Sequence, residues 1–404
     1  MPAILNGVRV LEVAEHTFVP AASALLADWG AEVIKIEHVE RGDAMRGLGS
    51  TGVTQIPADV HVLLEHANRG KKSLALDLSQ PDGLQVLYRL AAVSDVFLTN
   101  KLPGVRAKLG IGVEQIRAHN PRIIYVRGTG QGERGPDADK GSYDNLAFWN
   151  RSGVALGVMQ PGDERVPPPP GPAFGDSIGA MTIAGGIMGA LFHRERSGEA
   201  TVVDVSLLST AMWSHGSAIA LSLMTGTPWA MPAAGARRNP LTSNYRTGDG
   251  RWLSFTCLQA GKYWPLLAGV LDRPDLAADP RFADHVSLLE NSPDAVKILA
   301  EIFGAKPLAY WREKLSCFAG QWTVVQDTLE AAADPQSVAN GYIQECHTAA
   351  GVAFKLAAAP VQYDEEPARP ARAPLFNEHG DEILAGLGYD MDAVIDLKVR
   401  GVVA

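Results

Sequence analysis

Strand-like and helix-like segments alternate through the first third of the chain, and this alternation constrains the fold more than any other feature. Residues 8–13 (VRVLEV) and 32–37 (EVIKIE) are apolar runs typical of buried strands, and residues 21–29 between them have helical spacing. The alternation continues through the segments 73–78, 81–92, 95–99, 113–119 and 122–127. Because strands joined by helices pair in parallel, the sequence predicts a doubly wound α/β sheet.

The later part of the chain is organised differently. Proline and glycine are frequent in residues 135–172, which predicts a loop, and a helix dense in small residues is expected over 177–193. The section from about 228 to 330 begins with a hairpin signal, whose turn lies at 248–250, and continues with helical segments. This middle section has a character of its own.

Charge and cysteine content exclude several classes of protein. Lys and Arg total 36 against 45 Asp and Glu, and the net charge of -9 argues against a general nucleic-acid binder. The three cysteines fit neither a disulfide framework nor a zinc site, and we expect no metal. The N-terminus has no signal pattern, and the apolar stretch 178–192 is too short and too rich in glycine to span a bilayer. We expect a cytoplasmic protein.

The glycine-rich run 128–132 (GTGQG) follows a predicted strand and invites a dinucleotide-binding interpretation. Such a fingerprint needs a helix directly after the glycines. Residues 133–144 contain a proline and show no apolar period. We therefore expect a flexible connection there and reject a nicotinamide enzyme.

Asp176 is the most informative single residue, because it stands between a Pro/Gly loop and the predicted small-residue helix. Aspartate is a favoured N-cap, and spacing alone favours that role. A carboxylate held ionised at a helix start beside a loop is also a candidate nucleophile. The two hypotheses are compatible.

Two basic clusters stand out in this acidic chain. Residues 69–72 (RGKK) precede one predicted strand, and Lys101, Arg106 and Lys108 follow the end of another. Basic clusters are usually solvated faces, but two of them at strand–loop junctions of one sheet favour a polyphosphate site.

Several long stretches resemble the class III (CaiB/BaiF) CoA-transferases, in the family's order and over nearly the whole chain. The most specific are LADWGAEVIKIE and the GDSIGAM block that contains Asp176. The stretches are residues 5–46, 68–78, 99–112, 120–136, 175–208 and 373–389.

The resemblance implies a large doubly wound, Rossmann-like domain and a smaller α+β domain, in a homodimer of interlocked rings. Residues 1–225 would begin the large domain, 226–330 would form the small one, and 331–404 would return to the large domain. The substrates would be an acyl-CoA and a carboxylic acid, with no permanently bound cofactor.

The resemblance also assigns roles to residues. Asp176 matches the family's nucleophile, which forms a mixed anhydride and then an aspartyl-CoA thioester. Lys71 and Lys72 are phosphate partners by charge alone. The positions that match CoA-contacting segments of the family are Thr17, Phe18, His38, Leu76, Asp77, Ser79, Asn100, Lys101, Leu102, Lys108, Tyr143 and Asp144.

The chain departs from its oxalate-handling relatives at several of these positions. His38 stands where arginine is usual, which weakens one phosphate contact, and Thr17 stands where those members have glutamine. Their glycine-rich loop is replaced by residues 233–250. These changes argue against oxalate as substrate and leave the acids open.

Two other functions compete with CoA transfer. The α-methylacyl-CoA racemases belong to the same family and use a histidine where this chain has Tyr143, a poor base at neutral pH. Transfer is therefore favoured over racemisation. A non-catalytic acyl-CoA-binding protein is the third possibility, and the intact surroundings of Asp176 argue against it.

Overall fold

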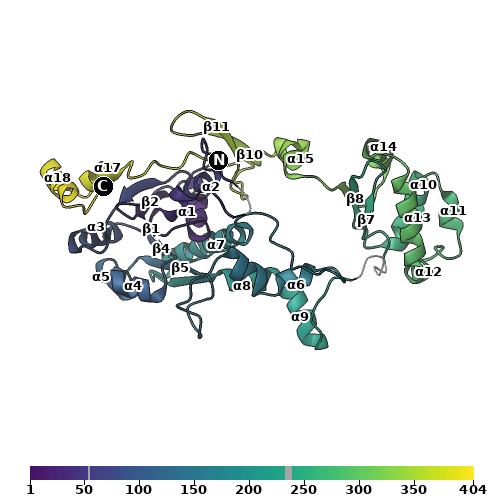
Figure 1. Ribbon diagram of the computed structural model, residues 1–404, viewed down its shortest axis with the longest axis horizontal. Coiled ribbons are helices and arrows are strands. Elements are labelled where there is room, and N and C mark those ends of the chain that lie inside the picture. Colours follow the sequence, from purple (N-terminus) through teal and green to yellow (C-terminus); the bar gives the residue numbers. More distant parts are fainter. Residues whose placement is uncertain (53–54, 233–238) are drawn as a thin grey trace. The chain divides into compact units, whose positions relative to one another are not determined.

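The computed structural model describes residues 1–52, 55–232 and 239–404 (Figure 1). They form two compact units. The large unit consists of Met1–Gly157, Val166–Trp229 and Pro335–Ala404, and the small unit of Val158–Arg165 and Ala230–Asp334. The chain therefore returns to the large unit after it has formed the small one.

A sheet of six parallel strands is the centre of the large unit (Figure 1). The strands are β1 (Arg9–Val13), β2 (Glu32–Glu37), β3 (Lys72–Ala75), β4 (Val96–Thr99), β5 (Ile124–Thr129) and β6 (Val202–Ser206). They lie in the order β3-β2-β1-β4-β5-β6, and every neighbouring pair is parallel. The predicted doubly wound sheet is confirmed, and its strand order reverses between β1 and β4.

The other elements of the large unit connect and cover these strands. Its helices are α1 (Phe18–Asp28), α2 (Val62–Asn68), α3 (Pro81–Ala92), α4 (Pro103–Leu109), α5 (Val113–His119), α7 (Phe174–Ser197), α8 (Leu207–Ser214), α9 (Gly216–Thr225), α16 (Pro335–Ala339), α17 (Gly380–Gly386) and α18 (Met391–Val399). All but the last residue of α6 (Val154–Val158) also belong to this unit. A 3-10 helix spans Ala44–Gly47, a π-helical turn spans Asn145–Asn150, and β10 (Ile343–His347) pairs with β11 (Ala353–Ala357) in a hairpin.

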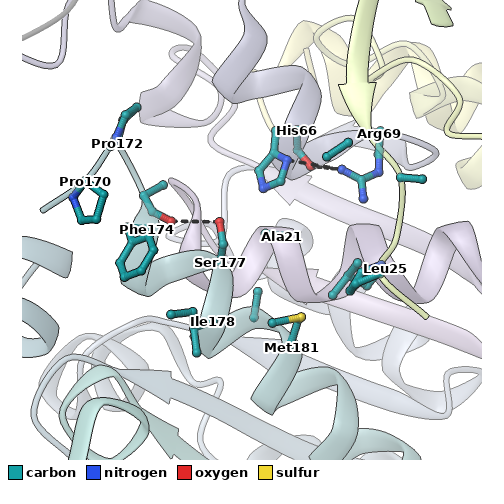
Figure 2. A pocket seen from close by; sticks show the side chains of 16 residues that line it. Ala21, Leu25, His66, Arg69, Pro170, Pro172, Phe174, Ser177, Ile178 and Met181 are labelled. Carbon is teal, nitrogen blue, oxygen red and sulfur yellow. Dashed lines mark hydrogen bonds between the residues drawn. The ribbon is translucent and has the colours of Figure 1, made fainter. Parts of the chain in front are cut away.

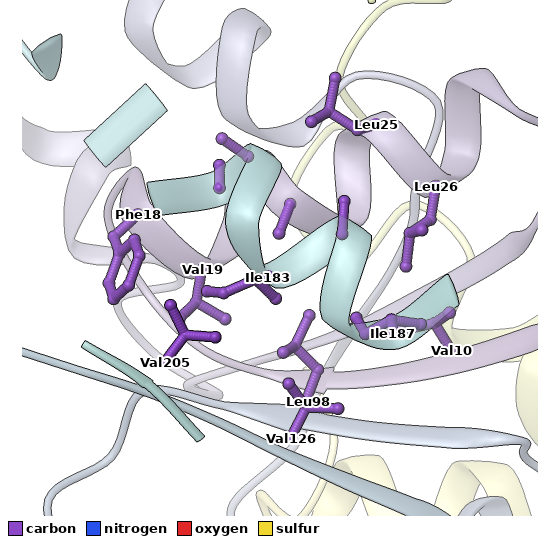
Figure 3. Close-up of a cluster of buried hydrophobic side chains, with 14 of the residues drawn as sticks. Val10, Phe18, Val19, Leu25, Leu26, Leu98, Val126, Ile183, Ile187 and Val205 are labelled. Atoms are coloured by element: carbon purple, nitrogen blue, oxygen red, sulfur yellow. The ribbon is translucent and has the colours of Figure 1, made fainter. Parts of the chain in front are cut away.

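Two apolar clusters cover the two faces of the sheet. In the first, α1 and α7 pack together over the strands through side chains such as Val19, Ile183 and Val126 (Figure 3). In the second, α3, α5, α17 and α18 bury side chains such as Leu87 against Tyr125. Tyr125 and Val126 are successive residues of β5, so they point to opposite faces. The long-range pairing of α1 with α7 brings the start of α7 to the sheet.

Helix α7 is longer than the sequence predicts. It has 24 residues, and by length and composition it is the one helix of the described residues that could cross a membrane. The predicted exclusion by length is therefore wrong. The helix instead buries Ala180, Ile183 and Ile187 against α1, β5 and β6, which is the position of a core helix. The cytoplasmic location stays a prediction.

The small unit is α+β. Its antiparallel sheet has the order β7-β8-β9, and the hairpin of β7 and β8 turns at 248–250 as predicted. The strands are β7 (Asn244–Arg246), β8 (Trp252–Phe255) and β9 (Trp322–Val324), and the helices are α10 (Ala260–Val270), α11 (Pro274–Ala278), α12 (His285–Glu290), α13 (Ser292–Gly304), α14 (Leu308–Lys314), the 3-10 turn Leu315–Cys317 and α15 (Thr328–Ala333). Residues 233–238, part of the loop that departs from the oxalate-handling relatives, lie outside the described residues.

Candidate active site

Most of the predicted binding residues lie in loops at one edge of the large sheet. Because the six strands are parallel, their carboxyl ends share that edge. Ligands of open α/β sheets bind there, near the point at which the strand order reverses. Leu76, Asp77 and Ser79 follow β3, and His38 follows β2. Thr17 and Phe18 follow β1, and Asn100, Lys101 and Leu102 follow β4.

Glu15 joins the two loops at the reversal point. Its backbone N–H donates to the Asn100 side chain over 3.2 Å, and its carbonyl accepts from the same side chain over 2.7 Å. The Glu15 carboxylate lies 2.7 Å from Lys101 Nζ and 3.6 Å from a guanidinium nitrogen of Arg41. No sequence motif marks Glu15, because its partners are distant in the chain.

A second group forms at the ends of β2 and β3. His38 is exposed, and Ser79 donates a 2.6 Å hydrogen bond to Asp77. The bonds from Ser79, and more weakly the proximity of His38, hold the pKa of Asp77 below its usual range. Leu76 is buried, whereas Lys108 on α4 is exposed and has no ion pair with any described residue.

Lys71 has no free donor for a ligand. Its buried ammonium donates to Glu12 Oε2 (2.7 Å), the Pro20 carbonyl (2.8 Å) and Asn68 Oδ1 (3.1 Å). An ammonium group has three donors, so none is left for a phosphate. This corrects the phosphate contact predicted for Lys71. Lys72, the next residue, is paired with two carboxylates.

Asp176 lies in the first turn of α7, although it is not the N-cap. That position belongs to Ala173, whose φ of 57° is left-handed. The capping acceptor comes from a distant loop, where Asp144 Oδ2 accepts the N–H of Gly175 over 3.0 Å. The cap role predicted for Asp176 is therefore wrong, because Asp144 performs it.

The electrostatics of this turn favour a reactive carboxyl group. Burial raises the pKa of Asp176 to about 7, and the nearby charge of Asp144 adds to the increase. Burial also raises the pKa of Asp144, against the backbone N–H groups that lower it. A carboxylate that is partly ionised near neutral pH and poorly solvated is well placed to act as a nucleophile.

Glycines let neighbouring side chains approach this turn. A Cβ on Gly175 would lie 2.3 Å from the Phe148 ring and 2.5 Å from Asp144 Oδ1, and one on Gly179 would lie 2.4 Å from the Phe18 ring. Phe18 therefore packs against α7 one helical turn beyond Asp176. In the glycine-rich run, Gly130 is needed for contact with another loop, since its Cβ would lie 2.4 Å from the Ser142 Cβ.

One residue that no sequence motif marks, His16, contacts a predicted binding residue. The ring of His16 contacts the ring of Tyr143 edge to face, with 5.7 Å between their centroids. Tyr143 is largely exposed and precedes Asp144. The loop after β1 and the segment that carries Asp144 therefore meet.

A separate pocket of about 480 Å³ lies along another face of α7 (Figure 2). Phe174, Ser177, Ile178 and Met181 line it, with spacing that defines one helical face, and Asp176 is not among its lining residues. The guanidinium of Arg69, at its other side, is bound to a buried carboxylate. The pocket contains none of the predicted binding residues. Within the described ranges no group of three His, Cys, Asp or Glu side chains could hold a metal.

Comparison with known proteins agrees with this arrangement. The family model for CoA-transferase family III matches residues 5–380. An (R)-2-hydroxy-4-methylpentanoate CoA-transferase of Clostridioides difficile is 30% identical over 99% of both chains. A cinnamoyl-CoA:phenyllactate CoA-transferase of Clostridium sporogenes is 27% identical over 98% of this chain and 96% of its own. The crystal structure of a CaiB/BaiF family protein from Brucella suis matches with a TM-score of 0.80 and 27% identity, over 96% of this chain and all of its own.

Proposed function

The chain belongs to CoA-transferase family III, and from this premise we propose that it moves CoA between two carboxylic acids through a covalent intermediate on Asp176. The observation that carries the proposal is the Asp176 carboxyl group itself. It lies at a helix start, next to a second carboxylate, and burial raises its pKa to about 7. These features suit a carboxylate that must attack a thioester carbonyl and later be released as a leaving group.

The steps balance without a net proton. An oxygen of Asp176 attacks the thioester carbonyl, and the C–S bond breaks to leave CoA thiolate and a mixed anhydride. The thiolate attacks the aspartyl carbonyl, which releases the first acid as a carboxylate and leaves an aspartyl-CoA thioester. The carboxylate of the second acid attacks that thioester and expels the thiolate. The thiolate then attacks the new acyl carbonyl, which releases the new acyl-CoA and the Asp176 carboxylate.

For CoA itself we propose the exposed loops at the ends of β2, β3 and β4. Lys108 supplies a cation that is unpaired among the described residues, and His38 and Lys101 add polar groups at the same sheet edge. Because Lys71 is fully engaged in the interior, it takes no part. The site therefore relies on fewer phosphate cations than the sequence predicts.

For the acid we propose a 2-hydroxy acid with an apolar side chain. The names of the two relatives above contain acids of this kind. Beside Asp176, Phe174 packs edge to face on both Phe148 and Trp149, with centroid distances of 6.2 and 6.4 Å. Through Phe148, whose ring packs against Gly175, this aromatic group supplies an apolar wall at the turn that carries the nucleophile.

The test is mass spectrometry of the wild-type protein and Asp176→Ala after incubation with cinnamoyl-CoA and 2-hydroxy-4-methylpentanoyl-CoA, followed by hydroxylamine. We expect a hydroxylamine-sensitive adduct on wild type only. Glu195→Ala, an exposed carboxylate on the same helix, is the matched control and should keep the adduct. An adduct that persists in Asp176→Ala would contradict the proposal. Incorporation of solvent deuterium at the α carbon of the acyl group without CoA exchange would also contradict it and would favour the racemase.

We further propose that the active form is a homodimer. None of the residues of the apolar helix α9 is buried within the chain. Trp213 on α8 is 88% exposed, and Met224 on α9 is 83% exposed, which is more apolar exposure than a solvated helix surface normally has. Light scattering should give twice the mass of 43.0 kDa for wild type, and Met224→Asp should lower it.

A further inference from the structure

The loop between β1 and α1 holds His16 in a left-handed backbone conformation, with a φ of 68°. Residues with a Cβ rarely adopt this conformation, and they keep it only where their surroundings fix it. Such residues cluster at ligand sites. The loop of His16 follows β1, next to the point at which the strand order reverses.

Side chains from three other segments fix this backbone. The N–H of His16 donates to Asp43 Oδ1 over 3.0 Å. The carbonyl two residues earlier accepts from Lys35 Nζ over 2.8 Å, and the peptide groups between them bond to Asn100. The conformation is therefore imposed by side chains of β2 and of the loops after β2 and β4, and it does not arise from the loop sequence.

Asp43 is itself anchored in a buried charge cluster. Its fully buried carboxylate lies 2.8 Å from Lys35 Nζ, which also pairs with Glu12 over 2.7 Å. Although burial alone would raise it, the Lys35 ammonium and two backbone N–H groups lower the pKa of Asp43 to about 2. Asp43 is thus an ionised acceptor at every working pH, and the His16 loop rests on a rigid base.

The His16 ring packs on the segment that caps the helix of the candidate nucleophile. It contacts Tyr143, and the next residue, Asp144, binds the first turn of α7. Two residues after His16, Phe18 packs against Gly179 on the same helix. The two segments therefore approach the start of α7 together.

An incoming acid meets an electrostatic problem at this place. Asp176 is a neutral thioester when the acid attacks, but Asp144 remains a carboxyl group, and its charge repels the carboxylate of the acid unless a donor offsets it. An imidazole offers at least one N–H donor in either protonation state. Lys101, the cation in the neighbouring loop, is already paired with Glu15.

On the basis of the proposed function, we propose that His16 binds the carboxylate of the incoming acid through an imidazole N–H, and that Asp43 is the positioning residue that holds the His16 backbone. His16 then contributes to the affinity for the acid, and Asp43 acts only through His16.

The first experiment separates the side chain from the backbone. His16→Gly retains the left-handed conformation, which glycine adopts freely, and removes only the imidazole. We expect the KM for the acid to rise about tenfold or more, as for the loss of a hydrogen bond to a charged group, and the KM for acyl-CoA to stay within about twofold. His16→Asn, which tolerates the same backbone and has an N–H donor, should recover part of the affinity for the acid. The substrates are cinnamoyl-CoA with phenyllactate or (R)-2-hydroxy-4-methylpentanoate.

The second experiment tests the positioning role. Asp43→Ala removes the oxygen that accepts the His16 N–H. It should raise the KM for the acid in the wild-type background and have no such effect in the His16→Gly background, because the residue acts only through His16. His193→Gln, an exposed histidine near the other end of α7, is the control and should behave as wild type. Thermal unfolding of each variant shows whether the fold is kept.

The outcomes distinguish this inference from the proposed function. An adduct on wild-type Asp176 with an unchanged KM for the acid in His16→Gly overturns only the inference. Equal increases in both KM values also overturn it, since they indicate a general disturbance. Absence of any adduct on wild type overturns the proposed function, and the inference with it.

Discussion

Asp144 acts on Asp176 in two ways, although 31 residues separate it from Gly175. Its carboxylate accepts the N–H of Gly175 and so caps the helix that carries Asp176. Its charge also disfavours the ionised form of Asp176 and raises the pKa of that group. The side chain of Asp144 therefore affects both the capping of α7 and the pKa of the nucleophile.

The variant Asp144→Asn separates these two effects, because the amide oxygen still accepts the Gly175 N–H while the charge is removed. We expect the pKa of Asp176 to fall, so that adduct formation below neutral pH becomes about threefold faster or more. The measurement is the rate of adduct formation between pH 5 and 8. A profile that keeps the wild-type midpoint would show that the charge of Asp144 does not reach Asp176.

Removing the charge of Asp176 should stabilise the folded protein. Since its folded pKa of about 7 lies above the usual value of 3.8, the native state binds more protons than the unfolded state between these values, and stability falls as pH rises through that window. Asp176→Asn has no carboxyl group at this position, so its stability does not fall with pH for this reason. We expect it to exceed wild type at pH 8 by on the order of 1–2 kcal/mol, after allowance for partial exposure, and by less at pH 5. Chemical denaturation at both pH values measures the difference, and a constant difference would contradict the raised pKa.

The substitution Gly175→Ala should damage both stability and activity. Its Cβ would meet the Phe148 ring and Asp144 Oδ1 at distances that force one of them to move. We expect a loss of about 1–3 kcal/mol and a strong decrease in adduct formation. Gly185→Ala on the same helix is the matched control, because nothing lies within 4 Å of its Cβ, and alanine should stabilise the helix slightly. Similar Tm values for both variants would disprove the close approach.

Lys71 and Lys108 should respond differently to substitution. Lys71→Met removes one of the two buried cations of Glu12 and should destabilise the fold by about 3–5 kcal/mol. Lys108→Ala should leave the Tm unchanged and weaken CoA binding several-fold, and added salt should reduce that difference. Calorimetric titration with CoA together with thermal unfolding separates the two roles. Normal stability of Lys71→Met with impaired CoA binding would restore the sequence-based hypothesis for Lys71.

The sequence by itself determines the local elements of this protein and the family to which it belongs. Apolar periodicity is a property of neighbouring residues, so the segments that became β1, β2 and β5 could be recognised without a structure, and their alternation with helices implied parallel pairing. The GD block and its glycines likewise mark Asp176, because motif residues are adjacent in the chain. Even here the role of the cap was misassigned, since the true capping acceptor is Asp144.

Only the tertiary structure decided which charged side chains are free to bind a ligand and which are paired inside the protein. Lys71 looks like a surface cation in the sequence, but 59 residues separate it from Glu12, its buried partner. The raised pKa of Asp176 depends on burial and on Asp144, and the strained backbone of His16 depends on Asp43. Burial, charge pairing and imposed backbone conformations arise from contacts between distant segments, and no local pattern in the sequence encodes them.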